Sequence, residues 1–336
     1  MTLILGIESS CDETSAAVIE NGRRILSNCI YTQIALHKPY GGVVPEIASR
    51  NHVLKLGEVV KGALEQSEKT LDEMDAVAVT CGPGLVGSLI TGVSYAKGLA
   101  LAKGKPLVGV NHIQGHIFAN FLAHEELEPP FICLVASGGH SHIVEVLGYN
   151  DIRLVGATRD DAAGEAFDKA ARALGLPYPG GPELEKLAKT GDSKAFKFPS
   201  GFNAGEHFDF SFSGLKTAVI NDIHTAQQRG EDVPKADIAA SFQAAVTEIL
   251  ISKTLRAAKT FGYSKVALAG GVAANETLRN GFEKTAKNNG ISFFCPPKVL
   301  CTDNAAMIGC AGYYRFVENR LSDMSLNAMP ALRLCE

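Results

Sequence analysis

Short apolar runs of strand length alternate along the chain with longer amphipathic stretches, which is typical of an α/β protein. Residues 4–7 form one such run, which meets a polar turn and resumes at residues 16–19. Residues 132–136 form another, which meets a similar turn and resumes at residues 143–146. Both patterns predict β-hairpins. Because the two resemble each other, they also predict two related halves that join near residues 105–130.

Small, polar or glycine-rich loops follow four of the predicted strands. They lie at residues 8–14, 81–88, 137–142 and 270–275. Backbone N–H groups in such loops and at helix N-termini attract anions, so four of them in one chain favour phosphate binding over plain tight turns. The sequence contains no P-loop, and the turn after the first predicted strand lacks the Gly-x-Gly-x-x-Gly pattern, which argues against P-loop and dinucleotide folds.

Composition adds limits to this picture. The chain has 336 residues, too many for one ordinary core, which predicts two domains. Hydrophobic residues make up 46% and charged residues 20%, so we expect a soluble protein without a membrane span. The eight cysteines form no Cys-x-x-Cys pair, which predicts a reducing, cytoplasmic location. With a net charge of −4, any nucleic acid is expected to bind through a local patch or with a partner's help.

Two histidines, His112 and His116, are the first candidates for chemistry. On a helix, residues i and i+4 share a face, so both imidazoles could hold one metal ion. From these two residues alone, a polar helix face or a helix cap explains the spacing equally well.

A series of motifs extends over essentially the whole chain. The first covers residues 6–14, Gly-Ile-Glu-Ser-Ser-Cys-Asp-Glu-Thr. The others, besides the histidine pair, are residues 41–46, 82–85, 137–140, 161–169, 178–182, 209–217, 270–275 and 301–307. Together these motifs resemble the TsaD family of tRNA threonylcarbamoyladenosine transferases, formerly labelled glycoprotein endopeptidases.

The resemblance implies the two-lobed α/β fold of actin, sugar kinases and Hsp70 (the ASKHA fold), with a nucleotide in the cleft between the lobes. We expect residues 1–111 and 305–336 to form the N-lobe and residues 112–304 the second lobe. The implied reaction moves the threonylcarbamoyl group from threonylcarbamoyl-AMP to N6 of the adenosine 3′-adjacent to the anticodon, in tRNAs that read ANN codons. AMP is the implied product. An inactive paralogue of TsaB type and a small ATPase of TsaE type are the implied partners.

The resemblance also implies roles for individual residues. It places one divalent metal ion, expected to be iron with zinc as the alternative, on His112, His116 and Asp303. Around the nucleotide and its acyl group it places Val135, Ala136, Ser137, Gly138, Gly139, Asp168, Gly181, Glu185 and Asn275. Asp12 and Glu13 are candidates for orienting the reacting groups or for general-base work. Archaeal relatives have a tyrosine ligand where this chain has Val135, which predicts more open metal positions here.

The residues alone leave simpler roles open. Asp303 and Asn275 could be helix caps. Asp168 could be a carboxylate at a helix N-terminus or form a surface ion pair. Asp12 and Glu13 could lie in a solvated turn.

Two other functions also stay open. A metal-dependent endopeptidase would explain the histidine pair, but Ile113 follows His112, so the glutamate base of a His-Glu-x-x-His motif is missing. A non-catalytic nucleotide-binding module of the ASKHA fold would need the loops but not the histidines. The helix predicted from Pro45 to Gln66 has two interpretations as well. Its apolar face either packs on the chain's own core or binds the paralogue.

Overall fold

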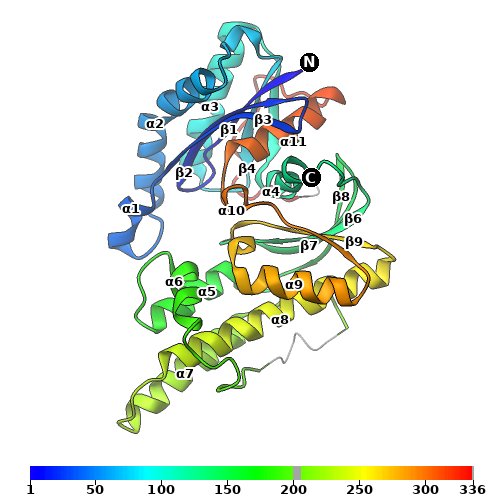
Figure 1. Ribbon diagram of the computed structural model, residues 1–336. Coiled ribbons are helices and arrows are strands. Elements are labelled where there is room, and N and C mark those ends of the chain that lie inside the picture. Colours follow the sequence, from blue (N-terminus) through cyan, green and yellow to red (C-terminus); the bar gives the residue numbers. More distant parts are fainter. Residues whose placement is uncertain (200–205, 335–336) are drawn as a thin grey trace. The chain divides into compact units, whose positions relative to one another are not determined.

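The computed structural model describes residues 1–199 and 206–334 (Figure 1). The chain forms two compact units. Unit 1 consists of Met1–Pro129, Gly148–Ile152 and Pro296–Glu336. Unit 2 consists of Pro130–Leu147 and Arg153–Cys295.

Unit 1 is built on a sheet with the strand order β3-β2-β1-β4-β5. Its strands are β1 (Leu3–Glu8), β2 (Glu13–Glu20), β3 (Arg24–Thr32), β4 (Ala76–Gly82) and β5 (Leu107–Asn111). Its helices are α1 (Ile34–His37), α2 (Pro45–Gln66), α3 (Val86–Lys103), α4 (His112–Ala123), α10 (Lys298–Cys301) and α11 (Ala305–Val317). Strand β1 pairs antiparallel with β2 and parallel with β4, which pairs parallel with β5.

Unit 2 is built on a sheet with the strand order β10-β9-β6-β7-β8. Its strands are β6 (Phe131–Ala136), β7 (Ser141–Gly148), β8 (Asp151–Ala157), β9 (Lys265–Ala269) and β10 (Ser292–Phe294). Its helices are α5 (Ala163–Ala173), α6 (Gly180–Ala188), α7 (Ser213–Gln228), α8 (Lys235–Phe261) and α9 (Glu276–Asn288). A short 3-10 helix, Gly271–Ala274, precedes α9.

The two sheets share one topology. In order, β3-β2-β1-β4-β5 corresponds to β8-β7-β6-β9-β10. The central strand of each sheet pairs antiparallel on one side and parallel on the other. The two antiparallel hairpins, β1–β2 and β6–β7, are those predicted from the apolar runs. The prediction of two related halves is therefore confirmed.

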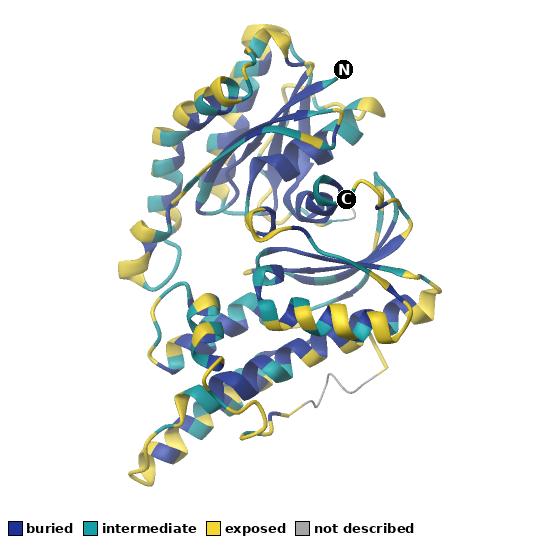
Figure 2. Cartoon of the chain, viewed as in Figure 1, coloured by how far each residue is buried: buried dark blue, intermediate teal, exposed yellow. Residues whose placement is uncertain are grey.

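Strand β1 is covered on both faces, which explains its nearly unbroken apolar sequence. Leu5 and Ile7 belong to a core cluster that also contains residues of α2 and α3. The alternate residue Gly6 faces α11, because a Cβ added to it would lie 2.4 Å from the carbonyl oxygen of Ala305. Figure 2 shows the strand as buried along its length. Glu8, two residues after Gly6, therefore enters a covered region on the α11 side.

The two units differ from the predicted lobes at their borders. Helix α4 and residues 296–304 belong to unit 1 and not to a second lobe. The physical reason is that α4 is buried along most of its length and packs on α11 and β5. The first border falls after Pro129, inside the region where the two halves were predicted to join.

The described part of the chain contains no helix that is both long and apolar enough to cross a membrane. The seven cysteines within it are all free thiols. Cys335 lies outside the described residues.

The close approach of α11 to β1 makes Gly6 sensitive to substitution. A Cβ at this position would also lie 2.7 Å from the backbone nitrogen of Gly309, so the helix must shift. We expect Gly6→Ala to lower the free energy of unfolding by about 1–3 kcal/mol, measured by urea denaturation. In the control, Gly98→Ala in α3, the new Cβ would meet nothing within 4 Å, and stability should stay equal or rise. Equal midpoints for the two variants would contradict this account.

Candidate metal centre and nucleotide pocket

Three strand ends meet at one edge of the sheet in unit 1. Strands β1, β4 and β5 run parallel, so their carboxyl ends share that edge, where open α/β sheets commonly bind ligands. Strand β1 ends at Glu8. Ile7 lies opposite Val79 in the register, which brings Thr80 of β4 beside Glu8. Strand β5 leads directly into α4, whose first residue is His112.

Helix α4 presents the two histidines on one face. Asn111 is its N-cap, since its Oδ1 accepts the N–H groups of Ile113 and Gln114. The rings of His112 and His116 lie 4.6 Å apart between centroids, and only 7% and 1% of these residues is exposed. A polar face would be exposed and the cap is Asn111, so neither simpler explanation of the pair holds.

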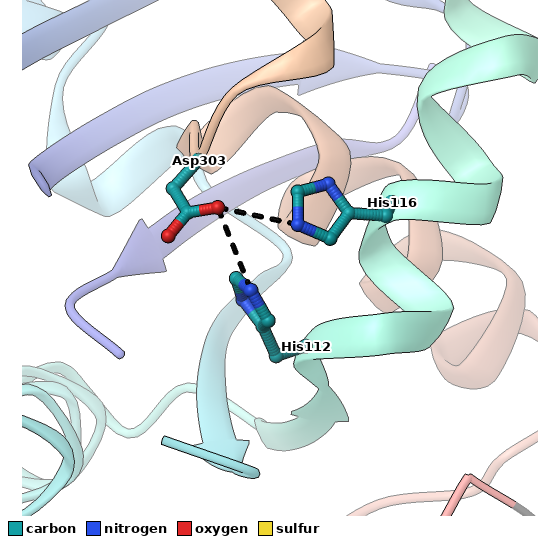
Figure 3. A group of neighbouring side chains, drawn as sticks. All are labelled: His112, His116 and Asp303. Carbon is teal, nitrogen blue, oxygen red and sulfur yellow. Dashed lines mark ion pairs between the residues drawn. The ribbon is translucent and has the colours of Figure 1, made fainter. Parts of the chain in front are cut away.

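Asp303 reaches the histidines from the loop between α10 and α11 (Figure 3). Asp303 is not the cap of α11, because Asn304 fills that role by accepting the N–H of Met307 at 3.1 Å. Oδ1 of Asp303 lies 3.5 Å from Nε2 of His112 and 3.2 Å from Nε2 of His116. The structure therefore brings together the three residues for which the sequence predicts a metal site.

The three side chains fit a divalent cation. Their candidate ligand atoms all lie within 4.8 Å of one another. Tetrahedral zinc with bonds of about 2.0–2.2 Å separates neighbouring ligands by about 3.3–3.6 Å. The distances from Oδ1 of Asp303 to the two histidine nitrogens, 3.5 and 3.2 Å, are close to this range. Among the described residues, Nε2 of buried His116 makes no hydrogen bond and contacts only Asp303, so this nitrogen is available to bind an ion. Unit 1 thus contains a possible metal-binding site.

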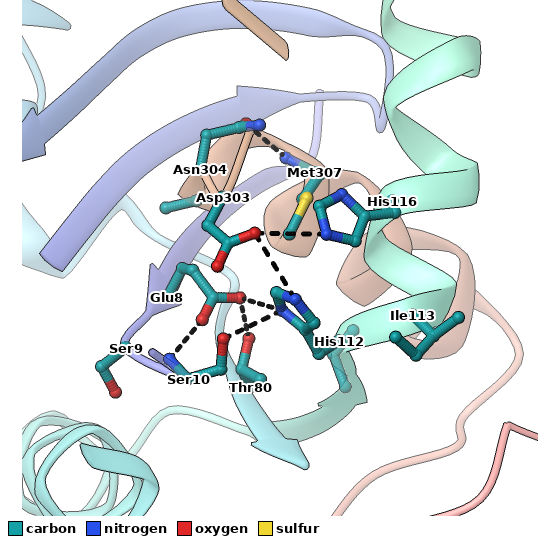
Figure 4. Close-up of polar contacts among 12 residues, drawn as sticks. Glu8, Ser9, Ser10, Thr80, His112, Ile113, His116, Asp303, Asn304 and Met307 are labelled. Atoms are coloured by element: carbon teal, nitrogen blue, oxygen red, sulfur yellow. Dashed lines mark hydrogen bonds and ion pairs between the residues drawn. The ribbon is translucent and has the colours of Figure 1, made fainter. Parts of the chain in front are cut away.

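A buried carboxylate lies behind His112 (Figure 4). Nδ1 of His112 is 3.0 Å from Oε2 of Glu8 and 3.1 Å from the hydroxyl of Ser10. Oε2 of Glu8 accepts a hydrogen bond from the hydroxyl of Thr80 at 2.6 Å, and Oε1 accepts one from the N–H of Ser10 at 2.5 Å. Glu8 has no exposed surface, so these donors replace its hydration.

Neighbouring charges set the pKa values of this pair. Burial by itself lowers the pKa of His112, but Asp303 and Glu8 outweigh it and raise the value to about 9. Burial raises the pKa of Glu8, but the charge and hydrogen bond of His112 lower it overall. The raised pKa of His112 stabilises the metal-free fold fully below the ordinary value of 6.5, and this contribution is lost as the pH rises through about 9.

Asp12 and Glu13 lie at the start of β2 in the same unit. Asp12 is buried, and Glu13 accepts a hydrogen bond from the hydroxyl of Thr32 at 3.1 Å. Burial raises the pKa of Glu13 well above its usual range, and the negative charges of Asp303 and Asp12 raise it further. The turn is therefore only partly solvated, since Asp12 is buried and Glu13 half-buried, and Glu13 is electrostatically coupled to Asp303.

Unit 2 contains a cavity of about 180 Å³. It is lined in part by five of the predicted substrate residues, Gly138, Asp168, Gly181, Glu185 and Asn275. Val135 and Ala136 are instead buried within β6, and Ser137 follows them as the first residue of the loop. Ligand pockets usually begin at roughly 300 Å³, so this cavity has room for part of a nucleotide.

Asp168 spans from α5 to the start of α6. Its Oδ1 accepts the N–H groups of Gly180 and Gly181 at 2.9 and 3.2 Å, which satisfies two donors at the N-terminus of α6. Burial raises the pKa of Asp168, although these two N–H groups act in the opposite direction. The neighbouring Lys169 pairs with Asp161 and Glu165, and the charge of Arg172 lowers the pKa of Asp168.

Asn275 and Glu185 both hold the start of α9. Asn275 caps the helix by accepting the N–H of Leu278, and its Nδ2 donates to Oε1 of Gln243, each at 2.9 Å. Oε1 of Glu185 accepts the N–H of Glu276 at 2.7 Å. The cap role of Asn275 is therefore real, and the same residue also lines the cavity.

The glycine-rich loops differ in how much backbone they leave open. In the loop after β4, the N–H of Gly84 donates to the carbonyl of Pro330, so this group serves the fold. In the loop after β6, a Cβ added to Gly138 or Gly139 would meet nothing within 4 Å. The same holds for Gly271 after β9. The loops of unit 2 are therefore the better candidates for a phosphate group.

Solved structures that resemble this chain show its fold. The chain matches HypF from T. kodakarensis with a TM-score of 0.64 and 18% identity, covering 97% of this chain and 49% of that one. It matches component A of the (R)-2-hydroxyglutaryl-CoA dehydratase of Acidaminococcus fermentans with a TM-score of 0.56 and 16% identity, covering 94% and 100%. The fold is the two-lobed α/β ASKHA fold, as predicted.

Sequence comparison then shows the family. The family model described as "TsaD: tRNA N6-adenosine threonylcarbamoyltransferase" matches residues 24–310. A protein of that name from Clostridium botulinum is 53% identical over 99% of this chain and 98% of its own length. One from Clostridium perfringens is 54% identical over the same shares of the two chains. The chain belongs to the TsaD family of tRNA N6-adenosine threonylcarbamoyltransferases.

Sequence reasoning missed two residues beside the metal site, Glu8 and Thr80. Glu8 stands 104 residues before His112, and no spacing rule connects them. Their contact arises only because β1, β4 and β5 are neighbours in the sheet. One signal was available, since a polar residue at the end of a fully buried strand needs a specific partner.

The raised pKa of His112 predicts how metal binding depends on pH. A metal needs the neutral ring, so each ion bound below about pH 9 must displace a proton. We expect the apparent Zn²⁺ affinity to rise about tenfold per pH unit between about pH 7 and 9, measured by competition with a chelator. Proton release on binding should be seen calorimetrically in buffers of different ionisation enthalpy. A flat affinity over this range would contradict the assignment.

Proposed function

We propose that this chain transfers the threonylcarbamoyl group from threonylcarbamoyl-AMP to N6 of the adenosine that is 3′-adjacent to the anticodon in tRNAs reading ANN codons, with release of AMP. The observation that carries the proposal is the convergence of His112, His116 and Asp303 in a chain of this family. The tRNA follows from the name that the relatives carry.

His112, His116 and Asp303 are the proposed metal ligands, and iron is the proposed ion, with zinc as the alternative. Two imidazoles and one carboxylate suit either metal. Val135 is buried in β6 and apolar, so we assign no fourth protein ligand there. When bound, the cation supplies a Lewis acid that polarises the acyl group.

Asp168, Glu185 and Asn275 are proposed to hold the nucleoside part of the substrate. Each has at least one polar atom tied to a helix start, which fixes the side chain before a ligand arrives. A fixed carboxylate can accept hydrogen bonds from two ribose hydroxyls. Gly181 leaves the backbone of α6 accessible beside them, because a Cβ there would meet nothing within 4 Å.

The loop of Ser137, Gly138 and Gly139 is proposed to hold the phosphate of the leaving AMP. Its open glycine backbone allows a phosphate to approach the N–H groups closely. Stabilising the negative charge of the leaving group lowers the barrier to acyl transfer. Val135 and Ala136 support this loop from the buried strand.

Asp12 and Glu13 are proposed to orient the incoming adenine amine and to take up its proton. The amine is a weak nucleophile because its lone pair is delocalised, so orientation matters more than a strong base. Burial and the charges of Asp303 and Asp12 raise the pKa of Glu13, which makes its carboxylate a stronger base than an exposed one. An endopeptidase would need a base at position 113, where the chain has buried Ile113.

Reconstitution with tRNA tests the proposed activity. Threonine, bicarbonate, ATP, the adenylate-forming enzyme and the partner proteins should yield threonylcarbamoyladenosine in tRNA, detected by mass spectrometry of digested nucleosides. We expect Asp303→Asn to lower transfer by at least about 100-fold, because loss of a ligand should exceed the effect of losing an outer contact.

The matched control is Asp72→Asn, which changes a surface carboxylate paired with Lys103. It should keep wild-type activity. Full activity of Asp303→Asn would overturn the metal assignment. No modified adenosine from the wild-type chain, with every other component shown to be active, would overturn the proposed reaction.

The partners are proposed to be an inactive TsaB-type paralogue and a small TsaE-type ATPase. For the paralogue, unit 1 offers an apolar surface, the α2–α3 patch, formed by Val53, Leu54, Val86 and Ile90, which are 67%, 68%, 55% and 47% exposed. Helices α2 and α3 pack closely here, since a Cβ added to Gly87 would lie 2.9 Å from Cβ of Ser49. Val53 is one turn beyond Ser49, so it shares that side of α2.

Farther along α2, the helix packs on the chain's own core. Val59 and Val60 are buried in the core cluster, and Leu64 packs against it. The two interpretations of this helix therefore apply to different positions along it, because Val53 shares a side of the helix with Val60 but is exposed. Charging Val60 would damage the core, so a test of the interface needs the exposed positions.

We expect the double variant Val53→Glu and Leu54→Glu to bind the paralogue at least about tenfold more weakly, because it places charges in an apolar contact. Binding is measured by isothermal titration calorimetry, with Zn²⁺ affinity as the check on folding. Leu101→Glu is the matched control, since Leu101 is 73% exposed near the other end of α3. Unchanged binding of the double variant would exclude the patch as the interface.

A further inference from the structure

We propose that Glu8 is a positioning residue that fixes the ring of His112 so that Nε2 points at the metal. The inference rests on the proposed metal site. It assigns the site a second layer that none of the sequence patterns indicated, formed by the end of β1 with Thr80 and Ser10.

The carboxylate of Glu8 is itself held on both oxygens. Oε1 receives the N–H of Ser10 at 2.5 Å, and Oε2 receives the hydroxyl of Thr80 at 2.6 Å. With no exposed surface, the carboxylate cannot turn towards water. Oε2 is therefore a fixed acceptor 3.0 Å from Nδ1 of His112.

A fixed acceptor at Nδ1 decides which ring nitrogen carries the proton. An ionised carboxylate accepts hydrogen bonds and cannot donate, so Nδ1 must carry the hydrogen. A neutral imidazole has one ring hydrogen, which leaves the lone pair on Nε2. Nε2 is the atom that lies 3.5 Å from Asp303. Glu8 thus selects the tautomer that a metal needs and fixes the ring plane.

The two histidines differ in this respect. Nδ1 of His116 has no hydrogen-bond partner among the described residues, whereas Nδ1 of His112 faces both Glu8 and Ser10. Among the described residues, Glu8 is the one carboxylate that contacts Nδ1 of either histidine. The assembly of the site therefore depends on Glu8 through His112, and His116 is held by the packing of α4.

A purely structural role for Glu8 makes a different prediction. If Glu8 serves only as an ion-pair partner that stabilises the metal-free fold, its loss lowers stability without a selective effect on metal binding. If it positions His112, its loss weakens metal binding in protein that is still folded.

Zn²⁺ binding to the full chain, without tRNA or acyl-adenylate, tests the proposal by competition with a fluorescent chelator. We expect Glu8→Ala to weaken Zn²⁺ binding roughly 10- to 100-fold, the usual effect of losing an outer partner of a metal-bound histidine. Glu8→Gln should lose less, because the amide oxygen still accepts the Nδ1 hydrogen. Thr80→Val should have a smaller effect in the same direction, and Thr80→Ser should restore it.

The matched control is Glu145→Ala in unit 2. Glu145 is also a buried carboxylate with a hydroxyl donor, Tyr263 at 2.6 Å, but within the described residues it is not part of a group of candidate metal ligands. It should keep wild-type Zn²⁺ affinity. In ¹⁵N-histidine-labelled protein, the Nδ1–H signal of His112 should be sharp in the zinc-loaded wild type and lost or exchange-broadened in Glu8→Ala.

Wild-type Zn²⁺ affinity in folded Glu8→Ala would overturn the inference, as would equal losses in Glu8→Ala and Glu145→Ala. If Glu8→Ala fails to fold, Glu8→Gln and Thr80→Val decide, and wild-type affinity in both would overturn it. Failure of the proposed reaction is distinguishable. It would appear as zinc-bound wild-type protein that modifies no tRNA, with the dependence of metal binding on Glu8 intact.

Discussion

The contact between β1 and α11 is the constraint on which the candidate metal centre depends. Glycines at positions 6, 309 and 312 remove the side chains that would keep helix and sheet apart. Helix α11 begins two residues after Asp303, so the position of the helix on the sheet determines where that carboxylate lies. The histidines of α4 are set by the same arrangement, because α4 packs on α11. The metal site is thus a product of backbone packing before any ligand is bound.

Near this contact the fold places several carboxyl groups whose mutual repulsion would be unfavourable without a compensating positive charge. Glu8, Glu13 and Asp303 are three carboxyl groups of one unit, and the pKa values of Glu8 and Glu13 both respond to Asp303. His112 offsets part of the negative charge only while it is protonated. A divalent cation would take over that role and allow the ring to be neutral. The electrostatics of unit 1 therefore favour the same ion that the geometry fits.

Local patterns in the sequence predicted what depends on local spacing. The two hairpins followed from apolar runs around a turn, and the pairing of His112 with His116 from helical spacing. The family motifs added Asp303 and the residues of the cavity in unit 2. Glu8 and Thr80 escaped because sheet order, which no short pattern encodes, makes them neighbours. The assignment of α4 to unit 1 was not predicted either. The junction between β5 and α4 at Asn111 is the predicted border between the lobes, although the helix is buried within unit 1.

The shared topology of the two sheets has a consequence for how each unit tolerates mutation. At the ends of β1 and β4, unit 1 uses the side chains of Glu8 and Thr80. At the equivalent ends of β6 and β9, unit 2 uses bare backbone, and a Cβ on Gly270, whose φ is +89°, would lie 2.4 Å from the carbonyl oxygen of Ala136. The edge in unit 1 is therefore sensitive to which side chain is present, whereas the edge in unit 2 is sensitive to the size of any side chain that is added.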